Sequence, residues 1–124
     1  MRFMNLIKSA ESADSPPKAL LDAIAKFGAE ATATGWLVSA GGLFPSAMGA
    51  RVRLSTGEVT ISDGPFTESK ELIGAYAIYK VASKQEAVER ASQFLQLYKE
   101  HWPVWEGEVE VRQMFDSPPE GKSG

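Results

Sequence analysis

The stretch GAYAIYKVASKQEAVERASQFLQLY, residues 74–98, places a predicted strand directly before a predicted helix. Residues 74–81 have the composition of a strand, and Ser83 followed by Glu86 is the pattern of a capping box at the start of a helix. The helix carries an apolar stripe at helical spacing, which consists of Val88, Ala91, Phe94, Leu95 and Tyr98. Pro103 sets the point by which this helix must end.

The same order of strand and helix opens the chain. Residues 2–7 form a short apolar run that predicts a strand, and a polar loop follows it. Ser15 is a suitable N-cap for the next helix, with Pro16 or Pro17 in its first turn. Gly35 ends this helix. Its apolar residues recur at helical spacing, at Leu20, Ile24, Phe27 and Ala31.

The remaining segments are predicted strands. Residues 36–44 indicate a strand in which Gly41 and Gly42 suggest a bulge or a close backbone approach. Residues 50–64, ARVRLSTGEVTISDG, alternate apolar and polar side chains on both sides of a Ser-Thr-Gly-Glu turn, which predicts a β-hairpin. A last strand begins near residue 108.

With the hairpin treated as an insertion, the elements predict a split β-α-β pair that is repeated once. This is the ferredoxin-like α+β arrangement, with the first and third main strands in the middle of the sheet. Because crossover connections are right-handed, both helices cover the same face of the sheet. A chain of 124 residues has room for one hydrophobic core, so we expect a single domain.

The sheet face without helices is also predicted to be apolar. Phe3 and Ile7 point one way and Met4 and Leu6 the other, while Tyr76 and Ile78 oppose Ala75, Ala77 and Tyr79 along the third main strand. An uncovered patch of this kind exceeds what soluble monomers normally expose. We therefore expect a homodimer in which the two sheets pack face to face.

Composition excludes several classes of protein. The net charge of -3 provides no excess of Lys and Arg for a phosphate backbone, so nucleic-acid binding is not expected. No apolar run approaches the length of a membrane span, and the N-terminal segment lacks the pattern of a secretory signal, so we expect a cytoplasmic protein without membrane contact. The sequence has no Cys, a single His and no phosphate loop or dinucleotide fingerprint, so no cofactor is expected.

The predicted topology brings two candidate catalytic residues to one pole of the sheet. The end of the first strand, the link between the second and third main strands and the end of the second helix all lie there. Asp63 and His101 could therefore form an acid/base pair. The alternatives are a turn-forming role for Asp63, as expected for Asp before Gly-Pro, and a helix-capping role for His101.

Further residues at this pole are candidates for binding a small molecule. Aromatic walls and a charged rim are the usual mixture in such pockets. The candidate ligand-binding residues are Phe66, Glu68, Lys70, Glu71, Tyr76, Trp102 and Trp105. The two Trp side chains could instead be core or dimer contacts, and Lys70 between two Glu residues could be a solvated surface.

The run DGPFTESKE, residues 63–71, resembles the signature Asp-Gly-Pro-Phe-x-Glu-x-Lys-Glu of the DGPF proteins, a branch of the YCII-related family. The ending HWPVWEGEVEVRQM, residues 101–114, is similar to that of one large subgroup. The resemblance implies one YCII/DGPF-type domain over residues 1–116, folded as a dimeric α+β barrel. Residues 117–124 are then expected to be a mobile C-terminal tail.

The resemblance also implies an activity. A His and an Asp are the proposed catalytic pair of YCII proteins, and one relative is regarded as a lyase that removes hydrogen chloride from a chlorinated aromatic intermediate. Asp63 matches the signature Asp. The family's His lies nearer the chain start, where this sequence has none, and His101 matches only the subgroup ending.

Three functional hypotheses follow, of which the third is a protein–protein adaptor that uses the dimer surface. The first is a protein that binds an unknown small molecule and uses acid/base residues without a cofactor, as a lyase or isomerase would. The alternative is a non-catalytic ligand-binding or regulatory module, because DGPF genes tend to lie beside sigma factors of the extracytoplasmic-function type. The resemblance therefore also implies a possible association with a sigma factor.

Overall fold

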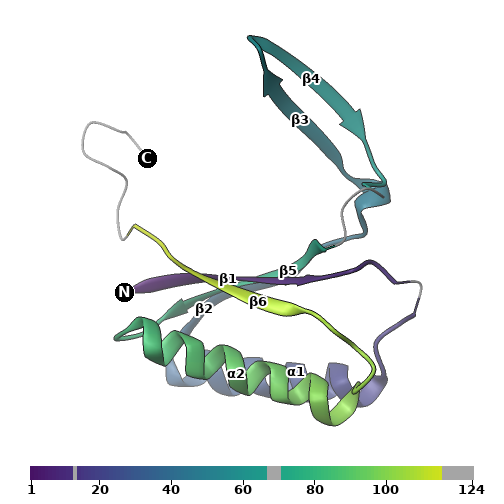
Figure 1. The fold of residues 1–124 in the computed structure, drawn as a ribbon. Coiled ribbons are helices and arrows are strands. Elements are labelled where there is room, and N and C mark those ends of the chain that lie inside the picture. Colours follow the sequence, from purple (N-terminus) through teal and green to yellow (C-terminus); the bar gives the residue numbers. More distant parts are fainter. Residues whose placement is uncertain (13, 67–70, 116–124) are drawn as a thin grey trace.

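The computed structural model describes residues 1–12, 14–66 and 71–115. Figure 1 shows two layers, a sheet with helices beneath it, and a hairpin that projects away from the sheet. The elements in chain order are β1 (Arg2–Ser9), α1 (Lys18–Thr34), β2 (Leu37–Gly42), a 3-10 turn η1 (Ser46–Met48), β3 (Ala50–Ser55), β4 (Glu58–Asp63), β5 (Leu72–Lys80), α2 (Lys84–His101) and β6 (Glu108–Gln113).

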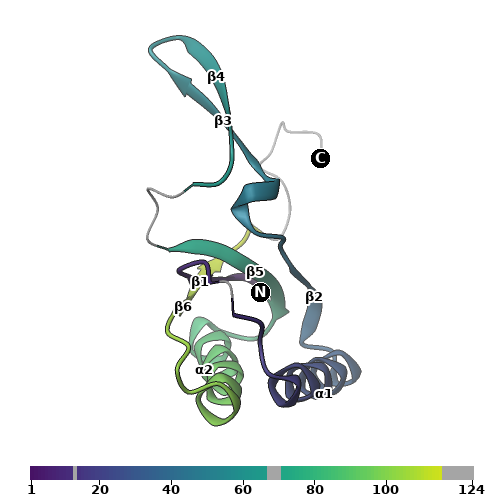
Figure 2. The same cartoon turned by 90° about the vertical axis from the view of Figure 1, so that its right-hand side faces the viewer.

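The main sheet has the order β2-β5-β1-β6, and every pairing in it is antiparallel. The first and third main strands, β1 and β5, are therefore central, as the sequence predicted. Both helices lie on one face of this sheet, side by side (Figures 1 and 2). The fold is α+β and ferredoxin-like, with β3 and β4 as an inserted hairpin.

Strand register defines the pole at which the candidate site lies. Ser9, the last residue of β1, pairs with Leu72, the first residue of β5, and Lys8 pairs with Glu108, the first residue of β6. Gly42 at the end of β2 pairs with Ala75. One end of the sheet therefore collects the ends of two strands and the starts of two others, and we call this end the pole.

The core lies between the sheet and the helices. The buried residues of the central strands are Phe3 and Ile7 on β1 and Ala77 and Tyr79 on β5. Met4, which follows Phe3 and points to the other face, is only half-buried. This alternation confirms which side of each central strand faces the helices. Buried alanines on both helices, Ala31, Ala87 and Ala91, allow close packing on the sheet.

The start of α1 differs from the prediction. The helix begins at Lys18 with Pro17 as its N-cap, and no side chain caps it, whereas Ser15 was the predicted cap. The cause is the double proline, because a residue that precedes a proline is disfavoured in helical conformation. Pro16 precedes Pro17, so neither Ser15 nor Pro16 enters the first turn. At the other end Gly35 is left-handed and caps the helix, as predicted.

The start of α2 agrees with the prediction. The Ser83 hydroxyl accepts a hydrogen bond from the Glu86 backbone N–H at 3.1 Å, which satisfies one of the unpaired donors of the first turn. The Glu86 carboxylate accepts a hydrogen bond from the Ala82 backbone N–H at 3.5 Å. In a capping box the donor would be the N–H of Ser83, one residue later. None of the helices in the described ranges has the length and apolarity needed to cross a membrane.

The hairpin forms a separate two-stranded sheet. Thr56 and Gly57, with φ of 48° and 82°, make the turn that matches the twist of a hairpin. Val52 pairs with Ile61 and Leu54 with Val59, so these four side chains share one face of the hairpin. Each is between 65% and 73% exposed. The hairpin thus presents an apolar face that its own chain leaves open to solvent.

Candidate functional site

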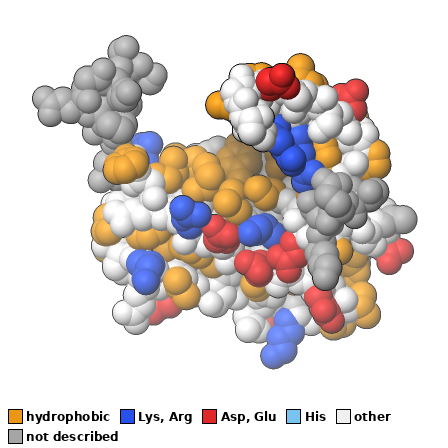
Figure 3. Space-filling model, turned by 45° about the horizontal axis from the view of Figure 1, so that its top comes forward, with side chains coloured by type: hydrophobic (Ala, Val, Ile, Leu, Met, Phe, Trp, Pro, Cys, Tyr) orange, Lys and Arg blue, Asp and Glu red, His pale blue; other side chains and the backbone are white. Residues whose placement is uncertain are grey.

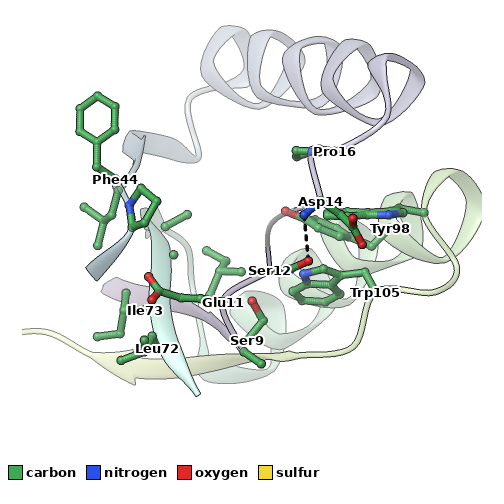
Figure 4. Close-up of a pocket in the computed structure, with 17 residues that line it drawn as sticks. Ser9, Glu11, Ser12, Asp14, Pro16, Phe44, Leu72, Ile73, Tyr98 and Trp105 are labelled. Carbon is green, nitrogen blue, oxygen red and sulfur yellow. Dashed lines mark hydrogen bonds between the residues drawn. The ribbon is translucent and has the colours of Figure 1, made fainter. Parts of the chain in front are cut away.

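The pole carries a cavity of about 290 Å³, which we call the pole recess. Its walls come from the end of β1 with the loop that follows and from the start of β5 (Figure 4). The segment after β2 and the end of α2 with its following loop complete them. Segments far apart in the sequence therefore meet here. The lining residues used below are Ser9, Glu11, Ser12, Asp14, Phe44, Leu72, Ile73, Tyr98, Trp102 and Trp105.

Two aromatic rings form one side of the pole recess. The Tyr98 and Trp105 ring centres are 4.4 Å apart, and Figure 4 shows Phe44 on the opposite side with Glu11 between them. A Cβ at Gly107 would overlap both the Trp105 ring and the Lys8 carbonyl oxygen, so only glycine lets the ring lie this close to the chain. Burial raises the pKa of Tyr98, so its hydroxyl stays neutral at ordinary pH.

Glu11 is the best anchored carboxylate of the pole recess. It accepts hydrogen bonds from the Ser46 hydroxyl at 2.6 Å and from the Ser46 backbone N–H. These two bonds hold the pKa of Glu11 below its usual value, and the bond from the hydroxyl has the larger effect. The carboxylate therefore serves as a fixed negative charge that ties the loop after β1 to η1.

Glu11→Gln should lower the free energy of unfolding at neutral pH. Because the folded pKa of Glu11 is depressed, its stabilising effect is present above the ordinary value of 4.5 and is lost as the pH falls through the folded pKa. The difference between wild type and variant should therefore shrink towards pH 3. Urea unfolding across that pH range measures it, with Glu58→Gln on the exposed hairpin as control. A difference that does not change with pH would contradict this role.

Residues 63–66, the described start of the signature and called the signature loop below, are anchored on η1. The Gly64 N–H donates to the Gly49 carbonyl at 2.9 Å, and the Phe66 N–H donates to the Ser46 hydroxyl at 3.1 Å. The Gly64–Pro65 peptide bond is cis. A Cβ at Gly64 would overlap the Ser46 carbonyl oxygen. Part of the signature therefore fastens the base of the hairpin to η1, and Ser46 links this base to Glu11.

A second cavity lies beside the pole recess, under the base of the hairpin, and we call it the hairpin-base pocket. It measures about 630 Å³, shares Glu11 with the pole recess, and is lined by Phe66 and Glu71, two of the predicted ligand-binding residues. The Arg51 guanidinium lies 3.9 Å from the centre of the Phe66 ring, a cation–π geometry. Both cavities thus combine aromatic and charged groups.

The two candidate catalytic residues lie outside the linings of these two cavities. Asp63 ends β4 opposite Ala50, and its exposed carboxylate makes no hydrogen bond or ion pair within the described ranges. The turn-bonding alternative for Asp63 is therefore not seen there. His101 ends α2, and its Nε2 is 3.8 Å from the Glu100 carboxylate. The pairing of Asp63 with His101 stays a prediction.

The other predicted ligand-binding residues are distributed around the pole. Trp102 and Trp105 both line the pole recess. Tyr76 pairs with Leu6 on the sheet face opposite the helices, and its hydroxyl is 3.3 Å from the Ser39 hydroxyl. Tyr76 also borders a cavity between α1 and the sheet. Glu68 and Lys70 lie outside the described residues, and so does the predicted tail, residues 117–124.

Sequence reasoning missed much of the pole recess. Glu11, Ser12 and Asp14 belong to a segment that reads as an ordinary polar loop, and nothing in it signals that Glu11 meets Ser46. Phe44, which is 80% exposed at the rim, ends a predicted strand and belongs to no motif. In the described part of the chain, no group of three or more Asp, Glu and His side chains is placed to hold a metal ion.

Comparison with known proteins identifies the family of the chain. The chain matches none of the curated proteins. The YCII-related domain matches residues 1–116, which is nearly the whole chain and includes β1, the signature loop and β6. Together with the ferredoxin-like fold and the docked signature loop, this match shows that the chain belongs to the YCII-related family.

Proposed function

We propose that this protein binds a small organic molecule in the pole recess. The observation that carries the proposal is the aromatic pair Tyr98 and Trp105 beside the fixed carboxylate of Glu11, around a cavity of about 290 Å³. A concave, largely apolar space with a few oriented polar groups is the usual form of a ligand site. A ligand of a single ring or short chain fits a space of this size.

The indole N–H signals of Trp102 and Trp105 provide a direct test. Benzylamine, benzyl alcohol and benzoate are titrated in turn while these signals are followed by NMR. At least one compound should shift both signals saturably, and Trp105→Ala should weaken its binding by about fivefold, since one aromatic contact contributes roughly 1 kcal/mol. Trp105→Phe keeps an aromatic ring and should retain most of the affinity. If no compound shifts either signal, the proposal is wrong.

Acid/base catalysis, as in a lyase or isomerase, is the second candidate function. His101 directly precedes Trp102, which lines the pole recess, and the Asp63 carboxylate has no partner in the described ranges. This candidate requires that Asp63→Asn and His101→Ala spare binding and abolish conversion of a bound substrate. A sensor that serves a sigma factor would need binding alone, so the regulatory alternative depends on the same recess.

We also propose that a second copy of the chain covers the sheet face opposite the helices, which we call the outer face. Register places Met4 opposite Ile78 and Leu6 opposite Tyr76 on this face. Figure 3 shows hydrophobic side chains gathered in the hollow between the hairpin and the sheet. The exposed apolar face of the hairpin is a second surface that a partner would bury, since an isolated hairpin is marginally stable in water. Two such surfaces on one chain suit a symmetric dimer.

A further inference from the structure

A third cavity adjoins the pole recess on the helix side of the sheet. It measures about 470 Å³ and lies between α1, the end of α2 and the sheet, and we call it the helix-side cavity. Ile7, Ala75 and Tyr98 line both this cavity and the pole recess. The two spaces therefore adjoin at these residues.

The helix-side cavity is apolar. Its walls include Phe27, Phe94 and Leu37, and glycines such as Gly28 leave space where a side chain would otherwise fill it. Burial raises the pKa of Tyr79, another wall residue, to about 12, as expected in surroundings of low polarity. A space of this kind favours an aromatic or aliphatic body, because apolar surface removed from water stabilises binding.

The pole recess differs by carrying negative charge beside its apolar walls. Glu11 and Asp14 place two carboxylates at its lining, with the hydroxyls of Ser9 and Ser12 nearby, and the described lining residues include no Lys, Arg or His. The Tyr98 and Trp105 rings stand on the same side as Asp14 (Figure 4). Carboxylates beside aromatic faces favour a cation and disfavour an anion.

We propose that the natural ligand is an amphipathic amine, whose protonated nitrogen occupies the pole recess and whose apolar body enters the helix-side cavity. This inference rests on the proposed function, because it assigns a ligand class to the same recess. It follows from the wall that the two cavities share at Ala75 and Tyr98 and from the carboxylates, which line only the pole recess. Leu21, which is 52% exposed, lies at the rim of the helix-side cavity and marks a way in from solvent.

A set of three probes tests the ligand class. These are 4-phenylbutylamine, 4-phenylbutyrate with the opposite charge, and butylamine without the ring. 4-Phenylbutylamine should bind at least about fivefold more tightly than either of the others, since one lost charge or ring contact costs roughly 1 kcal/mol or more. Binding is followed by the indole N–H signals of all three Trp residues.

Trp36 reports on the helix-side cavity. Its ring packs on Phe27 and Tyr79, at 5.6 Å and 4.9 Å between centres, and both of these residues line that cavity. 4-Phenylbutylamine should therefore shift the Trp36 signal together with those of Trp102 and Trp105. Butylamine, which is too short to leave the pole recess, should shift only the last two.

Ala75→Leu fills the junction of the two cavities. It should weaken 4-phenylbutylamine by about tenfold and butylamine by a smaller factor, because Ala75 also borders the pole recess. Gly28→Leu fills the helix-side cavity from the α1 side, where a Cβ would lie 3.9 Å from its nearest neighbour, Leu37, and it should act in the same way if Ala75→Leu does not fold. Ala25→Leu on the exposed side of α1 is the matched control.

The outcomes separate this inference from the proposed function. Tighter binding of 4-phenylbutyrate, or full affinity for 4-phenylbutylamine in the folded filling variants, would overturn the amphipathic amine while the pole recess remained a ligand site. Binding of benzyl alcohol or benzoate at Trp102 and Trp105 without any response to amines would do the same. If no compound shifts the signals of Trp102 and Trp105, both proposals are wrong.

Discussion

Gly64→Ala is expected to destabilise the protein by about 4 kcal/mol, close to the upper end of what single substitutions cost. A Cβ at this position would overlap the backbone carbonyl oxygen of Ser46, which cannot swing aside as a side chain would. Either the hairpin base moves away from η1 or η1 unwinds. Both changes remove the bond from the Gly64 N–H to the Gly49 carbonyl. Urea unfolding of the two proteins measures the difference.

Gly42→Ala is the matched control for this substitution. No atom lies within 4 Å of a Cβ built at Gly42, so the same chemical change should alter stability by less than about 1 kcal/mol. If Gly64→Ala unfolds at the same urea concentration as wild type, the docking of the signature loop on η1 is wrong. The expected result would show that this glycine is required for packing, whatever the signature does in binding.

Ile78→Lys should dissociate the proposed dimer. Ile78 lies on the outer face opposite Met4, where a second copy would bury it, and symmetry places two charges in one interface. Since burial of an unpaired charge is costly, association should weaken by roughly 100-fold or more. Sedimentation equilibrium over a range of concentrations measures the change, and the variant should remain folded because the substituted side chain is not part of the monomer core.

Val88→Lys is the control for the dimer experiment. Val88 lies on α2, on the other side of the sheet, and is 45% exposed, so the same substitution there should leave association unchanged. Wild-type protein that sediments as a monomer at every concentration would contradict the dimer. Equal association of wild type and Ile78→Lys would contradict the use of the outer face.

The sequence contained enough information for the fold because each element carries a local pattern. Alternation along β1 and β5, the Ser83 cap and the left-handed Gly35 follow from backbone geometry and burial, which act over a few residues. The predicted start of α1 was wrong because one local preference was overridden by a stronger one. The paired prolines displaced the start of α1 from the position that Ser15 favoured.

The candidate site could be predicted only in part, because its contacts join distant segments. Trp102 and Trp105 could be proposed from the sequence, because aromatic residues near a helix end at the pole are candidates for a pocket wall. Glu11 was missed because its partner, Ser46, is 35 residues away and neither residue belongs to a recognisable motif. The signature drew attention to Asp63, whereas the structure gives its neighbours Gly64 and Phe66 a packing role on η1.

A crystal structure of the protein grown with 4-phenylbutylamine would test most directly whether the pole recess holds a ligand. The proposed function and the ligand class together predict the amine nitrogen beside Glu11 or Asp14 and the phenyl ring beyond Tyr98, between α1 and the sheet. A probe bound only in the hairpin-base pocket or on the outer face, with the pole recess unoccupied, would contradict them.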